Sequence, residues 1–301
     1  MTIDQLQRFT IPGALKFERG EGGLIRAAIT TPQADAHVYL HGAHVTHYHP
    51  HQQAPLLFMS SKSLFEDGKP IRGGVPVCFP WFGPKKDDPS APAHGFARLR
   101  EWTVESSAKA DDGSVQLVLA LASDEATRKW WLHDFRAKLT VTVGAELRMA
   151  LEVQNTGSEP LTFEEALHTY FAVGDVRRVS VEGLEATDYL DKVGGLTKRN
   201  QGPNAVTFTG ETDRIYLNTR ATCVAHDPAG GRNISVAKDG SNATVVWNPW
   251  IAKAKAMPDF GDDEWPGMLC IETVNVGDFA VTVQPGQGHT MTAVVSGKTL
   301  A

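Results

Sequence analysis

The stretch LRMALEVQN, residues 147–155, decides the fold class of this chain. Apolar side chains occupy every second position from Leu147 to Val153, and polar ones such as Arg148 and Glu152 stand between them. Because successive side chains of a β-strand point to opposite faces, this pattern predicts a strand with one buried face and one face in water.

The same alternation recurs along the chain, in HVYLHGAHVTHYH, SVQLVLALA, KLTVTVG, ISVAK, ATVVW and FAVTVQPG. Turn-forming sequences such as DDG, NTGSEP, PAGG and KDG separate many of these runs. Many short strands joined by such turns are typical of an antiparallel sandwich, so we predict an all-β fold. Helices should be few and short; SDEATRKWW, from Ser123, is the one candidate, with acidic residues in its first turn.

Length and composition fit one folded unit. Of the 301 residues, 42% are hydrophobic and 21% are charged, which is ordinary for a folded soluble protein and excludes a disordered one. Length alone allows two domains, but all-β sandwiches run to ~250 residues as one domain. No linker-like segment interrupts the sequence, so we expect a single β-sandwich domain over residues 1–301.

The net charge and the cysteine content limit the binding partners and the cellular compartment that we expect. The net charge is −6 and no basic run is present, which makes nucleic acid and anionic membranes poor partners. No apolar run approaches the ~20 residues of a membrane-spanning helix, and MTIDQLQRFT does not resemble an export signal. The chain has three widely spaced cysteines, Cys78, Cys223 and Cys270. An odd, scattered set does not suggest a disulfide framework, so a reducing compartment is the simplest expectation. We expect a cytoplasmic monomer.

Two predicted strands carry polar groups that packing alone does not require. In LTFEEALHTYFA (161–172), alternation places His168 on the more polar face. In LCIETVNV (269–276), Glu272 shares a face with Cys270 in an otherwise apolar strand. A buried carboxylate is costly unless it is satisfied, so Glu272 is a candidate functional group. A lone strand histidine is more often a hydrogen-bonded structural residue.

Turn-rich segments precede these strands, at IRGGVPVCFPWFGP (71–84) and APAHGFARLREW (91–102), and such loops often carry functional sites. With ALHTYF, ETDRIY and IETVN following in order, the chain resembles the hexose-6-phosphate mutarotase (glucose-6-phosphate 1-epimerase) branch of the aldose 1-epimerase family, from about residue 20 onward. The resemblance implies a galactose-mutarotase-like β-supersandwich. It also implies an isomerase that interconverts the α and β anomers of a hexose 6-phosphate, such as glucose 6-phosphate, without a cofactor.

The resemblance assigns the proton transfers to two residues. His168 corresponds to the general acid that protonates the ring oxygen, and Glu272 to the general base that takes the proton of the C1 hydroxyl. Ring opening removes a proton from O1 while adding one to O5, so an acid and a base are both needed. We expect them on opposite sides of the sugar. Histidine, with an ordinary pKa of ~6.5, and a glutamate whose pKa burial raises suit this work near neutral pH.

Substrate-binding roles follow from the same resemblance. His94 of HGFAR would lie next to the sugar, Asp213 would bind its hydroxyls, and Arg72 and Arg98 would hold the phosphate. Arginine suits this role because it forms forked, charge-assisted bonds to phosphate. The residue before HGFAR, often glutamine in the relatives, is Ala93 here, so one polar sugar contact is missing or supplied elsewhere.

Other interpretations stay open at this stage. The arginines could form ordinary surface ion pairs, and His94 and Asp213 could merely shape turns. The histidine-rich run 37–51 lacks acidic or cysteine partners, so we predict no metal site there. WNPW (247–250) could stack on a sugar or close a core edge.

Alternative functions are an aldose 1-epimerase for unphosphorylated sugars and a non-catalytic carbohydrate-binding sandwich. A third is a glycoside hydrolase or lyase that uses paired carboxylates, which would need a second acid, such as Glu164 or Asp213, near Glu272.

Overall fold

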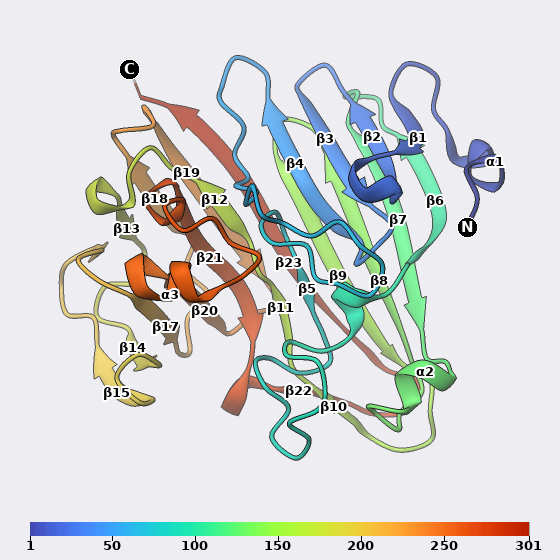
Figure 1. Cartoon of the computed structure of the whole chain (residues 1–301). Coiled ribbons are helices and arrows are strands. Elements are labelled where there is room, and N and C mark those ends of the chain that lie inside the picture. Colours follow the sequence, from blue (N-terminus) through green and yellow to red (C-terminus); the bar gives the residue numbers. More distant parts are fainter. Residues whose placement is uncertain (301) are drawn as a thin grey trace.

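Antiparallel strands are the main regular element of the structure, a computed structural model that describes residues 1–300 (Figure 1). The all-β prediction is confirmed. Strand β9 (Leu147–Asn155) coincides with the stretch that decides the fold class, and its apolar positions are fully buried. The α-helices are α1 (Ile3–Leu6), α2 (Glu125–Arg128) and α3 (Trp250–Ala256); single 3-10 turns span Gln7–Phe9, Glu21–Gly23, Ala97–Leu99, Val176–Arg178, Trp265–Gly267 and Gly277–Phe279.

A nine-stranded antiparallel sheet contains β9 and its neighbours. Its order is β16 (Val206–Thr207), β13 (Ser180–Glu182), β18 (Cys223–Asp227), β19 (Arg232–Asp239), β23 (Gly288–Thr299), β9, β8 (Phe135–Val143), β7 (Val115–Ala122) and β6 (Thr103–Lys109). Strands β8 and β9 alternate strictly between buried and partly exposed side chains, as their sequences predict. The sheet therefore has one face on the core and one toward water.

An eight-stranded sheet positions the polar residues singled out above. Its order is β15 (Thr197–Asn200), β14 (Asp188–Asp191), β17 (Thr212–Tyr216), β20 (Ala243–Asn248), β21 (Met268–Asn275), β11 (Glu165–Leu167) and β5 (Val77–Cys78), and β12 (Tyr170–Ala172) also pairs with β21. Every residue of β21 is buried, because neighbouring elements cover both of its faces. Glu272 thus lies in a strand whose residues are all shielded from water.

Two smaller sheets complete the fold. One consists of β1 (Leu15–Arg19), β2 (Ile25–Thr30), β3 (Ala34–Tyr39) and β4 (His44–Pro50), and lies over β6–β9 (Figure 1); the other pairs β10 (Leu161–Phe163) with β22 (Val281–Val283). Buried residues of the sheets form one continuous hydrophobic core.

The histidine-rich run 37–51 forms a hairpin of two strands, which corrects the interpretation of HVYLHGAHVTHYH as one alternating strand. Strands β3 and β4 are joined at Gly42 and Ala43, whose φ angles are 72° and 48°. Two successive residues in the left-handed region reverse the chain. Along this run His41, His44, His49 and His51 bond backbone carbonyl groups, which gives them a structural use.

The stretch 161–172 is also not one strand, because it breaks into β10, β11 and β12. The N–H of Thr169 donates to the carbonyl oxygen of Leu167 at 2.9 Å, which makes a γ-turn centred on His168. The N–H of His168 donates instead to the carbonyl oxygen of Pro76 at 3.0 Å. His168 therefore projects from a kink between two strands that both pair with β21.

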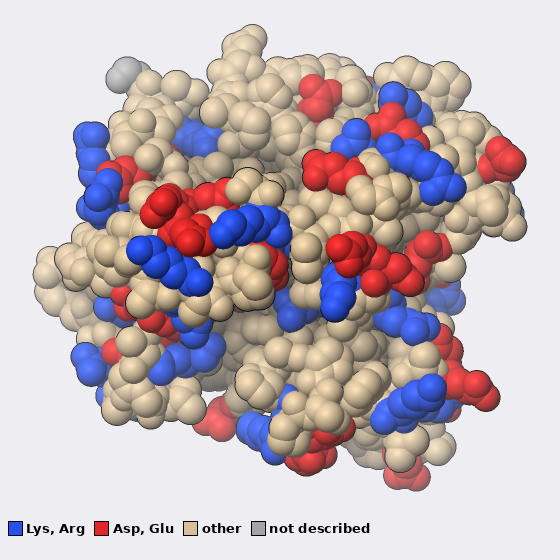
Figure 2. Space-filling view, viewed as in Figure 1, with Lys and Arg blue, Asp and Glu red and all other residues tan. Residues whose placement is uncertain are grey.

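The surface carries charges of both signs. Figure 2 shows lysine and arginine side chains interspersed with aspartate and glutamate over one face of the molecule, without a large region of a single sign. Within residues 1–300, no helix is long and apolar enough to cross a membrane.

Candidate active site

One cavity collects all the residues to which the resemblance gives a role. Its volume is about 290 Å³, near the lower end of the ~300–1,000 Å³ typical of small-molecule sites. Its lining consists of Arg72, Phe82, Ala93, His94, Arg98, His168, Lys192, Asp213, Trp247, Lys253, Met257 and Glu272. Residues far apart in the sequence thus meet around one space.

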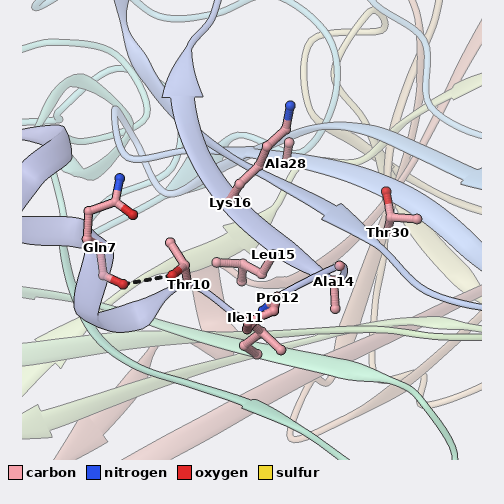
Figure 3. Close-up of a pocket in the computed structure, with 10 residues that line it drawn as sticks. Gln7, Thr10, Ile11, Pro12, Ala14, Leu15, Lys16, Ala28 and Thr30 are labelled. Atoms are coloured by element: carbon pink, nitrogen blue, oxygen red, sulfur yellow. Dashed lines mark hydrogen bonds between the residues drawn. The ribbon is translucent and has the colours of Figure 1, made fainter.

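A second hollow lies beside β1 and lacks such a collection (Figure 3). It measures about 440 Å³, and among its lining residues only Lys16 is charged. The ammonium of Lys16 pairs with Glu18 at 2.7 Å. Without an acid–base pair, this hollow offers no comparable chemistry.

His168 and Glu272 touch each other at the buried end of the first cavity. His168 Nε2 lies 3.3 Å from Glu272 Oε1, and the two residues are 8% and 1% exposed. Nothing the size of a sugar ring fits between them, so the expectation that they stand on opposite sides of the sugar is wrong. The γ-turn at His168 brings the imidazole down onto β21, which the alternation pattern did not reveal.

The surroundings shift the proton affinities of the pair in opposite directions. Burial, reinforced by the nearby Asp213 carboxylate, raises the pKa of Glu272 well above its ordinary value. Burial also lowers the pKa of His168, and the positive charge of Arg72 and Arg98 lowers it further, as does His94. Both shifts favour a proton on Glu272 beside a neutral imidazole over an imidazolium beside a carboxylate.

Aromatic side chains fix the imidazole. The ring of His168 stacks on Tyr170, with 4.8 Å between centroids and 11° between planes, and it meets the Trp247 ring edge to face with 5.9 Å between centroids. Of the two tryptophans in WNPW, Trp247 therefore lies in the cavity wall. Trp250 packs against Trp265, with 4.3 Å between ring centroids. The imidazole has little freedom to rotate between such neighbours.

His94 enters the cavity from a strained turn. Its φ is 64°, and its ring meets Phe82 edge to face at 4.7 Å and His168 at 5.8 Å. The next residue, Gly95, is also left-handed, and a Cβ there would lie 2.0 Å from the carbonyl oxygen of Phe79. Only glycine allows this close approach, so the HGF sequence is a geometric requirement for placing His94.

The two arginines differ in how their charge is balanced. Arg72 makes a forked ion pair with Asp259, with Nη2 at 3.0 Å from Oδ2, and donates to the Tyr170 hydroxyl at 3.0 Å. Arg98 donates to the carbonyl oxygen of Ala93 at 2.7 Å, and among the residues described it has no carboxylate partner. Arg98 therefore brings an uncompensated positive charge to the cavity.

Two lysines that the sequence analysis did not identify also line the cavity. Lys192 binds Asp213 at 2.9 Å and lies 5.5 Å above the ring of Phe82. Lys253, on α3, is 3.8 Å from Glu211. A lysine in an unremarkable loop carries no sequence signal, and α3 itself was not predicted. Ala93 lines the cavity with a methyl group and brings no polar side chain to it.

In the part of the chain that the structure describes, one group of three side chains is spaced closely enough to hold a metal ion. The ligand atoms of His168, Cys270 and Glu272 all lie within 4.8 Å of one another. In the histidine-rich hairpin, by contrast, the rings of His37 and His47 are 5.0 Å apart without a comparable third group.

Of the carboxylates considered for a hydrolase, Glu164 accepts the backbone N–H groups of Phe82 and Gly277, each at 2.8 Å. It does not line the cavity, unlike Asp213.

Comparison with known proteins gives a consistent result. The aldose 1-epimerase family matches residues 27–296. The Escherichia coli K12 protein named "Putative glucose-6-phosphate 1-epimerase" is 38% identical over 258 residues, which is 86% of this chain and 85% of that one. The Salmonella typhimurium structure described as "a putative mutarotase (YeaD)" superposes with a TM-score of 0.90 at 32% identity, over 97% of this chain and 96% of that one.

The structure of a "galactose mutarotase related enzyme" from Lactobacillus acidophilus has a TM-score of 0.73 at 14% identity, covering 92% of this chain and 98% of that one, and so shares the fold.

Proposed function

The chain belongs to the aldose 1-epimerase family, and from this premise we propose that it interconverts the α and β anomers of a hexose 6-phosphate, with glucose 6-phosphate as the first candidate. The observation that carries the proposal is the contact of His168 with Glu272 in a cavity that also contains an unpaired arginine, Arg98.

The contact between the two groups suits the reaction better than opposed positions would. O1 and O5 of a pyranose are bonded to the same carbon, so the groups that serve them must converge on one point. In ring opening, His168 gives a proton to O5 while Glu272 takes the proton of O1. Rotation about the C1–C2 bond then presents the other face of the aldehyde, and the reverse proton transfers close the ring.

The pair holds one proton throughout this cycle. The proton can lie on Glu272, which gives a carboxylic acid beside a neutral imidazole, or on His168, which gives an imidazolium beside a carboxylate. The shifted pKa values of the free protein favour the first arrangement. A bound phosphate dianion would neutralise positive charge from Arg98, which is one of the groups that lower the pKa of His168. Substrate binding thereby moves the proton toward His168 and prepares the acid. No electrons move and no group is transferred, so the chemistry needs no cofactor.

Arg98 is the principal phosphate ligand in this proposal. Arg72 already shares its charge with Asp259, so its contribution is a positioned N–H group with little net charge. Lys253, 3.8 Å from Glu211, adds a second cation at the cavity wall. In this proposal His94 and Asp213, which line the same cavity, contact the sugar. The protein's net charge of −6 means that a dianion is held by local charge and not by the overall field.

The test is the rate of α/β exchange of glucose 6-phosphate, measured by NMR with and without the protein. We expect acceleration that glucose does not match, and loss of that preference in Arg98→Met. Absence of acceleration for any phosphosugar would sink the proposal. If Arg98→Met slows glucose and its 6-phosphate equally, the phosphate role is wrong and an aldose 1-epimerase for free sugars takes its place. A non-catalytic sugar binder would bind without any exchange for Glu272→Gln to abolish.

A further inference from the structure

A thiol lies directly behind the proton-transfer pair. Cys270 is two residues before Glu272 on β21, so both side chains emerge on the same side of the strand. Cys270 is fully buried, and its sulfur is within 4.8 Å of ligand atoms from both His168 and Glu272. The proposed proton transfers make no use of this sulfur.

The spacing of the three atoms approaches that of a metal site. Zinc binds histidine nitrogen and carboxylate oxygen at roughly 2.0–2.2 Å, and a tetrahedral angle then separates these two atoms by about 3.4 Å. His168 Nε2 and Glu272 Oε1 are already 3.3 Å apart. A zinc–sulfur bond of roughly 2.3 Å requires the sulfur at about 3.6 Å from the other two, compared with 4.8 Å at most here. A small side-chain shift closes the site.

The donor set selects a class of cation. One nitrogen, one sulfur and one oxygen donor favour zinc and its softer relative cadmium over magnesium or calcium, which take oxygen ligands. His168 and Glu272 line the cavity, so a fourth position faces the sugar-binding space. His168 Nδ1 has no hydrogen-bond partner in the described chain, whereas a resident metal site usually orients its histidine through that atom. The arrangement therefore suits an inhibitor ion and not a permanent cofactor.

We propose that His168, Cys270 and Glu272 form a binding site for zinc or cadmium, and that the bound ion inhibits the protein by occupying the proton-transfer pair. The ion displaces the thiol proton of Cys270 and the one proton shared by His168 and Glu272, and both protons pass to solvent without any redox step. The inhibition rests on the proposed function, whereas the binding of the ion does not.

Cadmium binding to the full-length, metal-free chain tests the site directly, because a cadmium–thiolate bond absorbs in the ultraviolet. We expect one cadmium ion per chain, an ultraviolet band and proton release in weakly buffered solution. Cys270→Ser should abolish the band. Cys223→Ser is the matched control, since Cys223 is equally buried but lies on β18 in the other large sheet. The control should keep the band.

A second variant covers the case in which Cys270→Ser fails to fold. Glu272→Gln keeps the thiol but replaces the anionic carboxylate donor by a neutral amide oxygen, and its cadmium affinity should fall by more than the roughly 10- to 100-fold that loss of a merely orienting neighbour costs a metal site. No band in the wild-type chain, or equal loss in Cys223→Ser, would overturn the site. Unchanged cadmium affinity in Glu272→Gln would do the same.

Enzyme kinetics test the inhibition separately. Zinc should slow anomer exchange in the wild-type chain, a chelator should restore it, and Cys270→Ser should resist zinc relative to its own metal-free rate. Zinc binding without inhibition would overturn that half of the proposal. If the chain catalyses no exchange at all, the proposed function fails while the absorption experiment still decides the metal site.

Discussion

Two histidine–glutamate pairs lie near each other in this molecule, and they behave in opposite ways. His168 and Glu272 are joined at 3.3 Å, and His289 and Glu165 at 3.2 Å. Both glutamates are buried on the eight-stranded sheet, Glu272 on β21 and Glu165 on the neighbouring β11. Yet the pKa of His168 is lowered, whereas the pKa of His289 is raised.

The neighbours of each pair explain the difference. His289 bonds Glu165 and the carbonyl oxygen of Gly240 at 2.8 Å, and both acceptors favour the charged imidazolium. His168 is more deeply buried and is surrounded by His94 and the two arginines, which oppose a positive charge. Contact between a histidine and a glutamate therefore does not make an active site. The cavity beside His168 and Glu272 and the cations around them distinguish the pair that we propose as catalytic.

The largest expected contrast is catalytic. Glu272→Gln should lower the rate of anomer exchange by about 10²- to 10⁴-fold, because a positioned acid or base typically contributes that much. Glu165→Gln, a matched change in the other pair, should alter the rate only a few-fold. NMR exchange measurements on both variants decide this. Equal losses would show that the two pairs act as one network.

The next largest effect is on the free energy of unfolding, and it concerns the pair formed by His289 and Glu165. Glu165→Gln should lower the free energy of unfolding by about 1–3 kcal/mol, because it weakens a buried, charge-assisted contact. The raised pKa of His289 stabilises the fold fully below its unfolded value of 6.5, and this contribution disappears as the pH rises through the folded pKa. Urea unfolding should thus show the largest deficit below pH 6.5; a deficit that grows at higher pH would contradict this assignment.

Glu272→Gln should have the opposite pH dependence. The folded protein holds a proton on Glu272 after the unfolded chain has lost it near 4.5, so wild-type stability falls as the pH rises above that value. The glutamine variant lacks this loss, and its stability relative to wild type should increase between about pH 5 and about pH 8. We expect a gain on the order of 1 kcal/mol. Thermal or urea unfolding at the two pH values measures it, and a constant difference would argue against a protonated Glu272.

The smallest effect concerns the charges around His168. Activity should be bell-shaped in pH, falling on the acid side as His168 protonates below 6.5 and on the alkaline side as Glu272 ionises above 4.5. Arg98→Met removes one cation that lowers the pKa of His168, so that pKa should rise toward its ordinary value. Histidine NMR titration of the free protein reads this directly, with His289 as the internal control. A shift of both histidines would mean a global change.

The sequence predicts the sheets better than the site's geometry. Period-2 alternation in β8 and β9 reflects burial on one face, which is a local property, and it predicted these strands nearly residue by residue. The contact of His168 with Glu272 depends on a γ-turn formed with the backbone, and no side-chain pattern encodes that. Lys192 is likewise placed by the docking of a distant loop. The ion pair of Arg72 with Asp259 links segments 187 residues apart, which local reasoning cannot reach.

Strand β23 has a consequence for the order in which the molecule is made. It spans Gly288–Thr299 and lies between β19 and β9, hydrogen-bonded to both. During synthesis on a ribosome, the facing edges of β9 and β19 stay unpaired until Gly288–Thr299 emerge, so the nascent chain carries an open strand border on β9 through a long stretch of translation and on β19 through a shorter one. Pairing of β23 with both neighbours closes the sheet, and the open borders before that step are what chaperones would have to protect.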